Sequence, residues 1–401
     1  MRILFLHPRF PGPFGALATL LAADRDNTVL FLAERGRWER RLPRVRRLSL
    51  AAPREASVPQ ADMAAREMQM ALERASIAAN ALLRLRNDGF NPDIIYAASG
   101  GGHSLYARDI FPDSLFAVHA HWFYTKGENY NFFHQGKPRS PVDFAPARAR
   151  NLLQLNALAE CHFAATSTHW QKAQYPDTLS GGMHVLPEGV DCQGFSPSPG
   201  MRFVNPRDGK TPVPELVTFS ARSTEAARGF SQFYQSLPRL LHLRPQCHVL
   251  IMTPDMRSAD TLSLHETLMR EPDMESRVHI CSFRPSEEYR RVLQASSVHV
   301  YLTAPFALSS SLFEALSCGC AVVGSDTPPV REVIRHGENG MLCDFWDSNA
   351  LADTVAALLE HAGDVRPLRQ AARQTALDRY DVAKLTPQHA RLLLAALPHR
   401  G

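Results

Sequence analysis

Short apolar segments of strand length alternate with longer segments of helical periodicity through the first half of the chain. The clearest are a strand predicted over Ile3–His7, a helix predicted over 16–23 and a long helix predicted over 60–87. This alternation predicts a parallel, doubly wound sheet with helices on its faces. Ligands of such sheets bind at the carboxyl ends of the strands. The other strands predicted in this half are Thr28–Ala33, Asp93–Ala97, Leu115–His119 and Cys161–Thr166.

A proline-rich stretch over 187–214 precedes a second run of the same alternation. We predict a helix over 230–241, which Pro238 should end early because proline lacks the backbone N–H that a helix interior needs. A chain of 401 residues is too long for one core, so we predict two domains, over 1–190 and 191–380. The strands predicted in the second are Leu216–Ser220, His248–Met252, Val278–Ser282 and Val298–Leu302.

Charge, cysteine content and hydropathy argue against a nucleic-acid-binding, metal-binding or membrane-spanning protein. A formal net charge of +4 is too small by itself to imply nucleic-acid binding, and the seven cysteines are scattered. Cys318 and Cys320 flank a predicted turn, but no second pair or histidine cluster supports a metal site there, so we predict reduced thiols in a cytoplasmic protein. No apolar run reaches the length of about 18 residues that would predict a membrane span.

Serines open a short predicted helix that a glycine turn and a buried strand follow. The start of this helix, with Ser309, Ser310, Ser311 and Leu312, offers unpaired backbone N–H groups and a partial positive charge to a phosphate. Glu314 lies one turn further along, within reach of a ribose attached to that phosphate. An ordinary buried helix capped by serine is the alternative, and the pattern alone leaves the two open.

Two further loops at predicted strand ends carry candidate functional residues. Arg222 and Arg228 follow the first strand of the second half, and their forked, permanently charged guanidinium groups suit a diphosphate; two surface arginines are the alternative. In the first half, glycines after the strand Asp93–Ala97 permit a close backbone approach to a ligand. We predict an acceptor-side loop there, formed by Gly101, Gly102 and His103.

The stretch that begins at Glu314 resembles the C-terminal motif of retaining, nucleotide-sugar-dependent glycosyltransferases of family four, which have the GT-B fold. The segments Pro329–Ile334 and Gly337–Leu342 follow in the family's order. The family carries an earlier glutamate at the position of Phe306, so the donor-sugar contact of that glutamate is in question here. The resemblance implies two Rossmann-like domains that face each other across a cleft, with a last helix, over 381–401, that completes the first domain.

The resemblance also implies roles for individual residues of the second half. Glu314 would bind the ribose, and Arg222 and Arg228 would stabilise the leaving diphosphate. Phe283 or Arg284 would stack on the nucleobase or border it, although the end of a hydrophobic strand explains Phe283 equally well.

In the first half, the resemblance implies a histidine that faces the sugar. His119 and His121 lie on one face of a predicted strand; we prefer His121, which is nearer the loop, and interpret His119 as a buried, satisfied histidine. The loop with Gly12 and Gly15 resembles the family's first glycine-containing loop, which approaches donor phosphate or acceptor. A tight strand-to-helix turn is the alternative.

These patterns predict a retaining glycosyltransferase that moves a sugar from a nucleoside diphosphate, UDP in the first instance, to a glycan, lipid-linked or small-molecule acceptor. No D-x-D motif follows a predicted strand, so we expect activity without metal or cofactor. Phe306 keeps a second class open, an inactive or weak nucleotide-sugar-binding partner subunit. The basic stretch Arg35–Arg47 predicts either a peripheral contact with the inner face of a membrane or a solvated loop, and 129–143 is a candidate acceptor loop.

Overall fold

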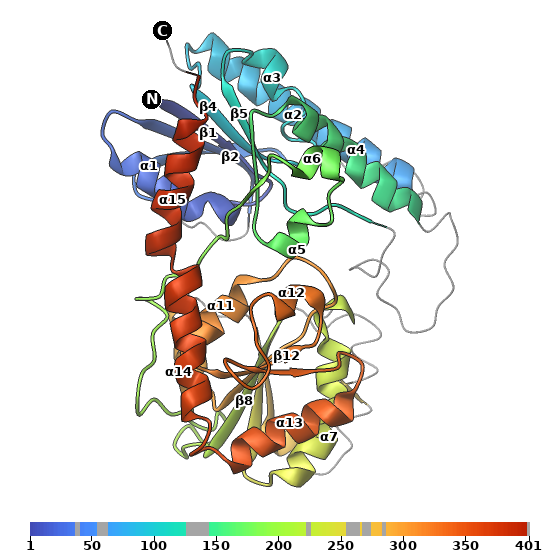
Figure 1. Cartoon of the computed structure of the whole chain (residues 1–401), viewed down its shortest axis with the longest axis vertical. Helices are drawn as coiled ribbons and strands as arrows, with labels where there is room; N and C mark the ends of the chain where they lie inside the picture. The colour runs from blue at the N-terminus through green and yellow to red at the C-terminus, as the bar shows by residue number, and fades with distance from the viewer. Residues whose placement is uncertain are drawn as a thin grey trace. The chain divides into compact units, whose positions relative to one another are not determined.

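The chain folds into two α/β units, each built on a parallel sheet (Figure 1). The computed structural model describes residues 1–36, 41–53, 63–125, 144–221, 226–253, 265–266, 274–282 and 286–398. The first unit comprises Met1–Glu188 and Ala383–Gly401, and the second comprises Gly189–Val382.

The first unit contains, within the described residues, a seven-stranded sheet in the order β3-β2-β1-β4-β5-β6-β7. Successive residues of β1 serve opposite faces of this sheet, as strand geometry requires. Ile3 and Phe5 pack with residues of α1 and α15, whereas Leu4 and Leu6 pack with α2 and α4. The strands are β1 (Arg2–Leu6), β2 (Thr28–Glu34), β3 (Val45–Leu50), β4 (Ile94–Ala98), β5 (Leu115–His119), β6 (Phe163–Thr166) and β7 (His184–Val185). The helices are η1 (Gly12–Phe14), α1 (Gly15–Ala23), α2 (Met63–Asn87), α3 (Ala107–Ile110), α4 (Ala145–Glu160), α5 (His169–Lys172), α6 (Asp177–Ser180) and α15 (Val382–Ala395).

The second unit contains a six-stranded sheet over the described residues, in the order β10-β9-β8-β11-β12-β13. Helices α7 and α13 lie side by side on one face (Figure 1), and α10, α11 and α14 contribute to the core on the other. The strands are β8 (Glu215–Ser220), β9 (Cys247–Met252), β10 (Val278–Cys281), β11 (Val298–Tyr301), β12 (Ala321–Ser325) and β13 (Met341–Cys343). The helices are η3 (Ala226–Arg228), α7 (Phe230–Leu243), α9 (Met274–Arg277), α10 (Ser286–Ala295), α11 (Ser310–Ser317), α12 (Pro328–Arg331), α13 (Ser348–Glu360), α14 (Arg366–Thr375) and η4 (Ala376–Tyr380).

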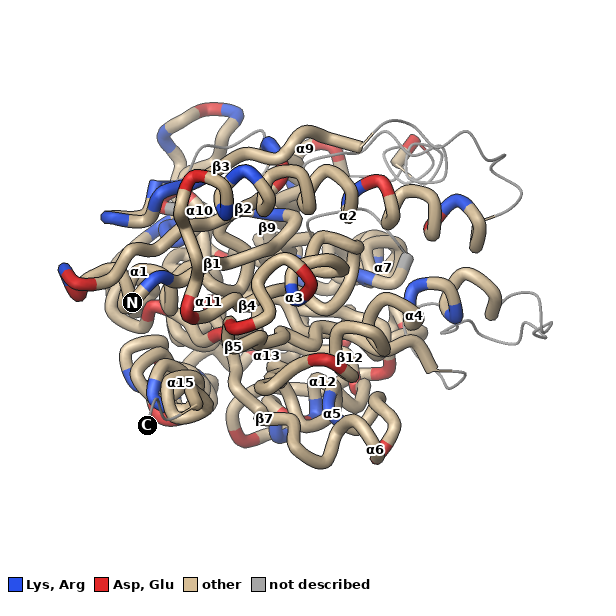
Figure 2. Tube along the Cα trace, turned by 90° about the horizontal axis from the view of Figure 1, so that it is seen from above, with Lys and Arg blue, Asp and Glu red and all other residues tan. Residues whose placement is uncertain are grey.

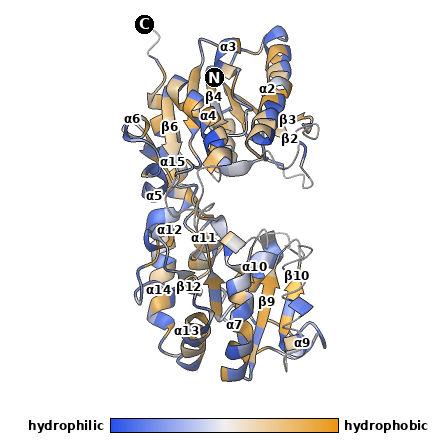
Figure 3. Cartoon of the chain, turned by 90° about the vertical axis from the view of Figure 1, so that its right-hand side faces the viewer, coloured by the Kyte–Doolittle hydropathy of each residue, from blue (hydrophilic) through white to orange (hydrophobic). Residues whose placement is uncertain are grey.

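The predicted parallel, doubly wound sheets are confirmed, and Figure 3 shows their strands as mostly hydrophobic and the helices around them as mixed. The early end predicted for α7 is wrong, because the helix continues through Pro238 to Leu243. Leu237, Leu240 and Leu241 are fully buried around that proline. Burial of each such side chain contributes about 1.5–3 kcal/mol, which offsets the backbone hydrogen bond that the proline removes.

Three strands at sheet edges, β3, β7 and β13, were not predicted from the sequence. They are only two to six residues long, and β3 lies in a stretch that its arginines marked as a loop. The C-terminal helix α15 belongs to the first unit from Ala383 onward, where Ala390 and Leu393 enter the core.

Candidate functional site

Arg228 lies at the carboxyl end of the sheet in the second unit, in the turn that follows β8. One terminal nitrogen of its guanidinium donates to Thr303 Oγ1 at 3.2 Å and to the carbonyl oxygen of Ala307 at 3.4 Å. Both acceptors belong to the loop after β11, the neighbour of β8 in the sheet. The arginine is therefore held in place by two acceptors of one loop, while its half-buried side chain keeps further N–H donors for an anion.

Backbone contacts fix the turn that carries Arg228. The amide of Ala304 donates to the carbonyl oxygen of Ala227 at 2.7 Å. Gly229 has a φ of 68°, and a Cβ there would lie 2.3 Å from Leu302 Cβ. Only glycine fits this close approach, so Gly229 sets the distance between the turn after β8 and the loop after β11.

Phe306 stacks against this same arginine. The guanidinium carbon of Arg228 lies 5.3 Å from the centre of the Phe306 ring, within the range of a cation–π contact. The residue that departs from the family motif thus supports the arginine predicted to bind the diphosphate.

The N-terminus of α11 completes this group of residues. Ser309 is its N-cap, but the side chain makes no capping hydrogen bond to the helix; its hydroxyl lies 2.6 Å from Ser311 Oγ. The amide of Ser309 donates to the Tyr301 hydroxyl at 3.0 Å, which ties the helix start to β11. Because no side chain caps the first turn, its N–H groups suit a phosphate.

Glu314 lies in the second turn of α11, half-buried and close to the buried Tyr289. Burial raises the pKa of Tyr289 well above its usual value, and the charge of Glu314 raises it further. The Tyr289 hydroxyl lies 3.3 Å from Ser220 Oγ at the end of β8. Glu314 is thereby placed near the same strand ends as Arg228, although its predicted ribose contact stays a prediction.

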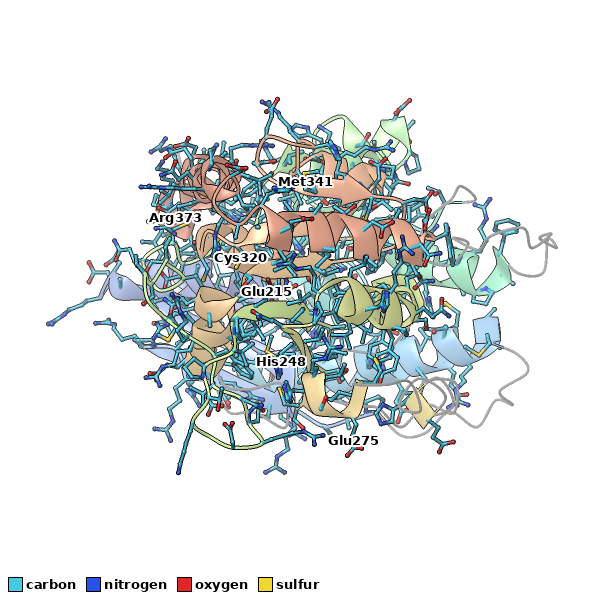
Figure 4. All side chains as sticks on the ribbon, turned by 90° about the horizontal axis from the view of Figure 1, so that it is seen from below. Glu215, His248, Glu275, Cys320, Met341 and Arg373 are labelled. Atoms are coloured by element: carbon cyan, nitrogen blue, oxygen red, sulfur yellow. The ribbon has the colours of Figure 1, made fainter. Side chains whose placement is uncertain are left out.

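Arg373 fixes the other end of α11, and Figure 4 labels it together with Cys320. It donates to the carbonyl oxygen of Ser317 at 2.7 Å and to that of Phe195 at 2.9 Å. A cation at a helix C-terminus offsets the partial negative charge there. Burial raises the pKa of Cys320 to about 12.

In the first unit, the loop after β1 packs tightly on His7. Gly12 has a φ of 53°, and a Cβ there would lie 2.4 Å from His7 Nδ1. Gly15 begins α1 with ordinary helical dihedrals. These contacts fix the loop against His7, and its approach to donor phosphate or acceptor stays a prediction. Burial lowers the pKa of His7 to about 4.

His119 is the last residue of β5 and His121 lies two residues further on, with the two ring centres 6.1 Å apart. His121 is exposed, whereas His119 is buried and packs edge-on against Phe14. Burial lowers the pKa of His119 well below its usual value, and the nearby His121 and His7 add to this. Within the described residues, His119 Nε2 has no hydrogen-bond partner, so His119 differs from the satisfied histidine that we expected.

His103 is buried after β4, where its Nε2 lies 3.0 Å from Glu34 Oε1. This hydrogen bond is the main cause of the lowered pKa of Glu34. Gly101, Gly102 and His103 were predicted from the sequence, whereas His7 and Glu34 were not. Their signal was position, since His7 directly follows β1 and Glu34 ends β2.

Several predicted residues lie outside the described residues: Arg222, Phe283, Arg284, the segment 129–143 and part of the basic stretch Arg35–Arg47. Of that stretch, Arg47 is described in β3, with its guanidinium carbon 5.0 Å from the centre of the Phe10 ring. No helix in the described part of the chain is both long and apolar enough to cross a membrane. The described residues also contain no group of three or more histidine, cysteine or acidic side chains placed to bind a metal.

Two models of protein families match the chain. Residues 25–195 match the model described as "Glycosyl transferase family 4 group". Residues 214–361 match the model described as "Glycosyl transferases group 1". These matches support a glycosyltransferase of the family-four type.

Named relatives of this type align over part of their length. The phosphatidyl-myo-inositol mannosyltransferase of Mycobacterium leprae is 30% identical over 220 residues, which cover 54% of this chain and 54% of that protein. The GDP-mannose:cellobiosyl-diphosphopolyprenol alpha-mannosyltransferase of Xanthomonas oryzae pv. oryzae is 23% identical over 236 residues, 58% of each. The chain thus spans about half the length of the curated relatives that it matches.

A solved structure agrees over almost the whole chain. HepE from Anabaena, in complex with UDP and glucose, matches with a TM-score of 0.72 and 17% sequence identity. The match covers 98% of this chain and 100% of HepE. The predicted GT-B fold is confirmed.

Proposed function

We propose that the protein is a retaining glycosyltransferase that uses a nucleoside-diphosphate sugar, with UDP as the nucleotide. The observation that carries the proposal is Arg228, held by Thr303 and Ala307 near the end of β8, in the unit where α11 begins without a side-chain cap. A fixed cation and a helix N-terminus are what a leaving diphosphate needs in the absence of a metal ion.

In the proposed reaction, the bond between the anomeric carbon and the donor phosphate breaks, and a bond to the acceptor hydroxyl oxygen forms on the same face of the sugar. The acceptor proton passes to the leaving phosphate oxygen, so no side chain serves as nucleophile. Arg228 and the first turn of α11 stabilise the charge that develops on the diphosphate. The name of the Xanthomonas relative favours a GDP-sugar as the alternative donor, and both names support a lipid-linked acceptor.

A panel of UDP-, GDP-, ADP- and dTDP-sugars in a thermal-shift assay tests the donor. A ligand at about 100 times its dissociation constant should stabilise the fold by roughly 2.7 kcal/mol. Radiolabelled donor should then transfer to acceptor in the presence of EDTA, with the anomeric configuration retained in the product. A panel in which no nucleotide sugar stabilises the protein would reject the proposal.

Phe306 supports a second candidate, a nucleotide-sugar-binding partner subunit without its own activity. The aromatic ring replaces a carboxylate that the resemblance assigns to the donor sugar, while Arg228 and Glu314 are retained. Stabilisation by a nucleotide sugar with neither hydrolysis nor transfer of that donor would favour this candidate over the enzyme.

A further inference from the structure

Thr303 lies in the loop that joins β11 to α11, just beyond the point where β11 stops pairing with β12. The last pair of residues in that ladder is Tyr301 and Gly324. Thr303 is fully buried, so its backbone N–H and C=O groups need hydrogen-bond partners that the ladder no longer supplies. Two side-chain hydroxyls take the place of a strand neighbour.

Ser325 and Thr327 provide these hydroxyls. The amide of Thr303 donates to Ser325 Oγ at 3.0 Å, and Ser325 Oγ donates to the Thr303 carbonyl oxygen at 3.0 Å. Thr327 Oγ1 donates to the same carbonyl oxygen at 3.2 Å. A carbonyl oxygen has two lone pairs, so it can accept both hydrogen bonds. The backbone of Thr303 is therefore held entirely by the end of β12 and the residue that follows it by two positions.

The hydroxyl of Thr327 serves the loop rather than its own helix. Thr327 is the N-cap of α12, a position where a hydroxyl ordinarily accepts from the first turn, but its side chain makes no such hydrogen bond. Ser325 and Thr327 are two residues apart in extended backbone, which places them on one side. Asp326 between them is exposed and pairs with Arg331. The segment thus directs two hydroxyls inward and its carboxylate outward.

The side chain of Thr303 connects this network to Arg228. Thr303 Oγ1 donates to the carbonyl oxygen of Ala304 at 2.9 Å, so its one proton is in use. The oxygen is left as an acceptor, and Arg228 donates to it at 3.2 Å. The two inward hydroxyls fix the backbone of Thr303, and the Thr303 hydroxyl in turn fixes the direction of the guanidinium group.

The groups that hold Arg228 are neutral. Besides Thr303 it contacts the carbonyl oxygen of Ala307 and the ring of Phe306. Figure 2 shows that charged residues lie mostly on helices and loops, and Glu215 is the only charged residue in the described strands of the second unit. Because no carboxylate takes part in holding it, the guanidinium keeps its full charge for an anionic ligand.

We propose that Ser325 and Thr327 are positioning residues for Arg228 and act through Thr303. They are 0% and 2% exposed, so they act without touching a ligand. Their effect on the reaction rests on the proposed function, whereas their effect on the orientation of the guanidinium does not. Loss of these hydroxyls leaves the cation in place but frees its direction, so it should weaken stabilisation of the leaving diphosphate more than binding of the donor.

Steady-state kinetics with the best donor of the nucleotide-sugar panel tests this difference. In Ser325→Ala, which removes two of the three hydrogen bonds to Thr303, we expect kcat to fall about tenfold and KM for the donor to change less than about twofold. Thr327→Val removes the third hydrogen bond and should lower kcat about threefold. Thr327→Ser keeps the hydroxyl and should return kcat to the parent value.

Thr218→Val is the matched control for the loss of a buried hydroxyl. Thr218 lies in β8 of the same sheet and is fully buried, with Oγ1 2.8 Å from both Ser296 Oγ and His299 Nδ1. The variant should melt at a lower temperature, as Ser325→Ala should, but keep the parent's kcat. An equal fall of kcat in Thr218→Val and Ser325→Ala would overturn the proposal.

A double-mutant cycle tests whether Ser325 acts through Arg228. In the Arg228→Ala background, Ser325→Ala should cause no further loss of kcat, because the group that it orients is gone. A second loss of about tenfold in that background would show that the two residues act independently and would overturn the proposal.

NMR of the arginine side chains, without any ligand, separates this proposal from the proposed function. The Arg228 signals are assigned by their loss in Arg228→Lys. A guanidinium held by Thr303 and Ala307 should rotate slowly and give resolved N–H signals in the parent and in Thr218→Val, and averaged signals in Ser325→Ala. Averaged signals in the parent, or resolved ones in Ser325→Ala, would overturn the proposal. The expected spectra in a protein that no nucleotide sugar stabilises would reject the transferase alone.

Discussion

The two sheets end in different chemistry, although both units follow the same strand-and-helix plan. At the carboxyl ends of the second sheet, Arg228 donates to the hydroxyl of Thr303. Thr303 and Ser325 are fully buried, and Ser325 Oγ accepts from the Thr303 amide and donates to the Thr303 carbonyl oxygen. At the carboxyl ends of the first sheet, His7, His103 and His119 are buried within a few residues of β1, β4 and β5. An arginine stays charged at every physiological pH, whereas burial lowers the pKa of His7 to about 4 and that of His119 well below its usual value, so these two imidazoles gain protons only in acid.

This difference agrees with different ligands for the two units. A diphosphate is a permanent anion, which an arginine and backbone N–H groups bind without any change of protonation. Acceptor hydroxyls are neutral and need donors and acceptors together, which imidazoles and paired carboxylates supply. We therefore expect acidic pH to lower the stability of the fold mainly through the buried histidines of the first unit. We expect removal of a charged side chain to weaken function mainly at the donor site of the second unit.

The largest expected effect is the pH dependence contributed by His7. Its folded pKa of about 4 lies below the ordinary value of 6.5, because burial disfavours the cation. The unfolded state thus binds the proton first, and stability present above pH 6.5 is lost as the pH falls toward 4. At about 1.4 kcal/mol per pKa unit, the loss is about 3 kcal/mol.

Urea titrations at pH 7, 5.5 and 4.5 measure this loss. His7→Asn should reduce the fall in the free energy of unfolding over that interval, since asparagine does not titrate. The exposed His169 on α5 offers the control His169→Asn, which should leave the dependence unchanged. A His7→Asn protein with the parent's full pH dependence would contradict the assignment.

The next largest effect is expected at Arg228. Arg228→Ala removes the fixed cation, and we expect donor turnover to fall about 100-fold, or about 2.7 kcal/mol of transition-state stabilisation. Arg228→Lys should recover part of this, because lysine keeps the charge but not the fork.

The control is Arg239→Ala, which removes an exposed arginine on α7 that pairs with Asp353. It should retain the parent's kcat/KM. Parent-like turnover in Arg228→Ala would show that Arg228 does not act in the donor site. The second sheet edge would then lose the cation that distinguishes it from the first.

Periodicity and chain length were enough to predict the two parallel sheets. Strands such as β1 and β12 are buried apolar runs, and their pattern is local in the sequence. The edge strand β3 was missed because it carries Arg46 and Arg47, one on each face, and adjacent arginines look like a loop when the pairing with β2 is unknown.

The candidate site was predictable where its residues are consecutive, as in Ser309–Ser311 and Glu314. Contacts between distant segments were not. The support of Arg228 by Phe306 joins residues 78 positions apart, and the hydrogen bond between His103 and Glu34 spans 69 positions. Such pairs follow from strand order, which periodicity alone does not specify.

Glu314→Gln is expected to weaken binding of the nucleoside diphosphate by roughly 2 kcal/mol, about 30-fold, because a charge-assisted hydrogen bond to the ribose is lost. Calorimetry of UDP, or of the diphosphate that the panel selects, measures this in parent and variant. A glutamate that only favoured the helix dipole would contribute about 0.3–1 kcal/mol to stability. If Glu314→Gln binds the nucleoside diphosphate as tightly as the parent but melts at a lower temperature, Glu314 has a structural role. Glu360→Gln, at the end of α13, serves as the control.

The smallest effect is expected at Phe306, whose ring packs on Arg228 in the second unit. A cation–π contact at a partly exposed site contributes about 0.5–1 kcal/mol, so Phe306→Leu should weaken diphosphate binding about two- to fivefold by leaving Arg228 less well ordered. Phe306→Tyr keeps the ring face and should bind as the parent does. Calorimetry of the same nucleoside diphosphate distinguishes these outcomes, and equal affinity in all three proteins would show that Thr303 and Ala307 hold the arginine without the ring.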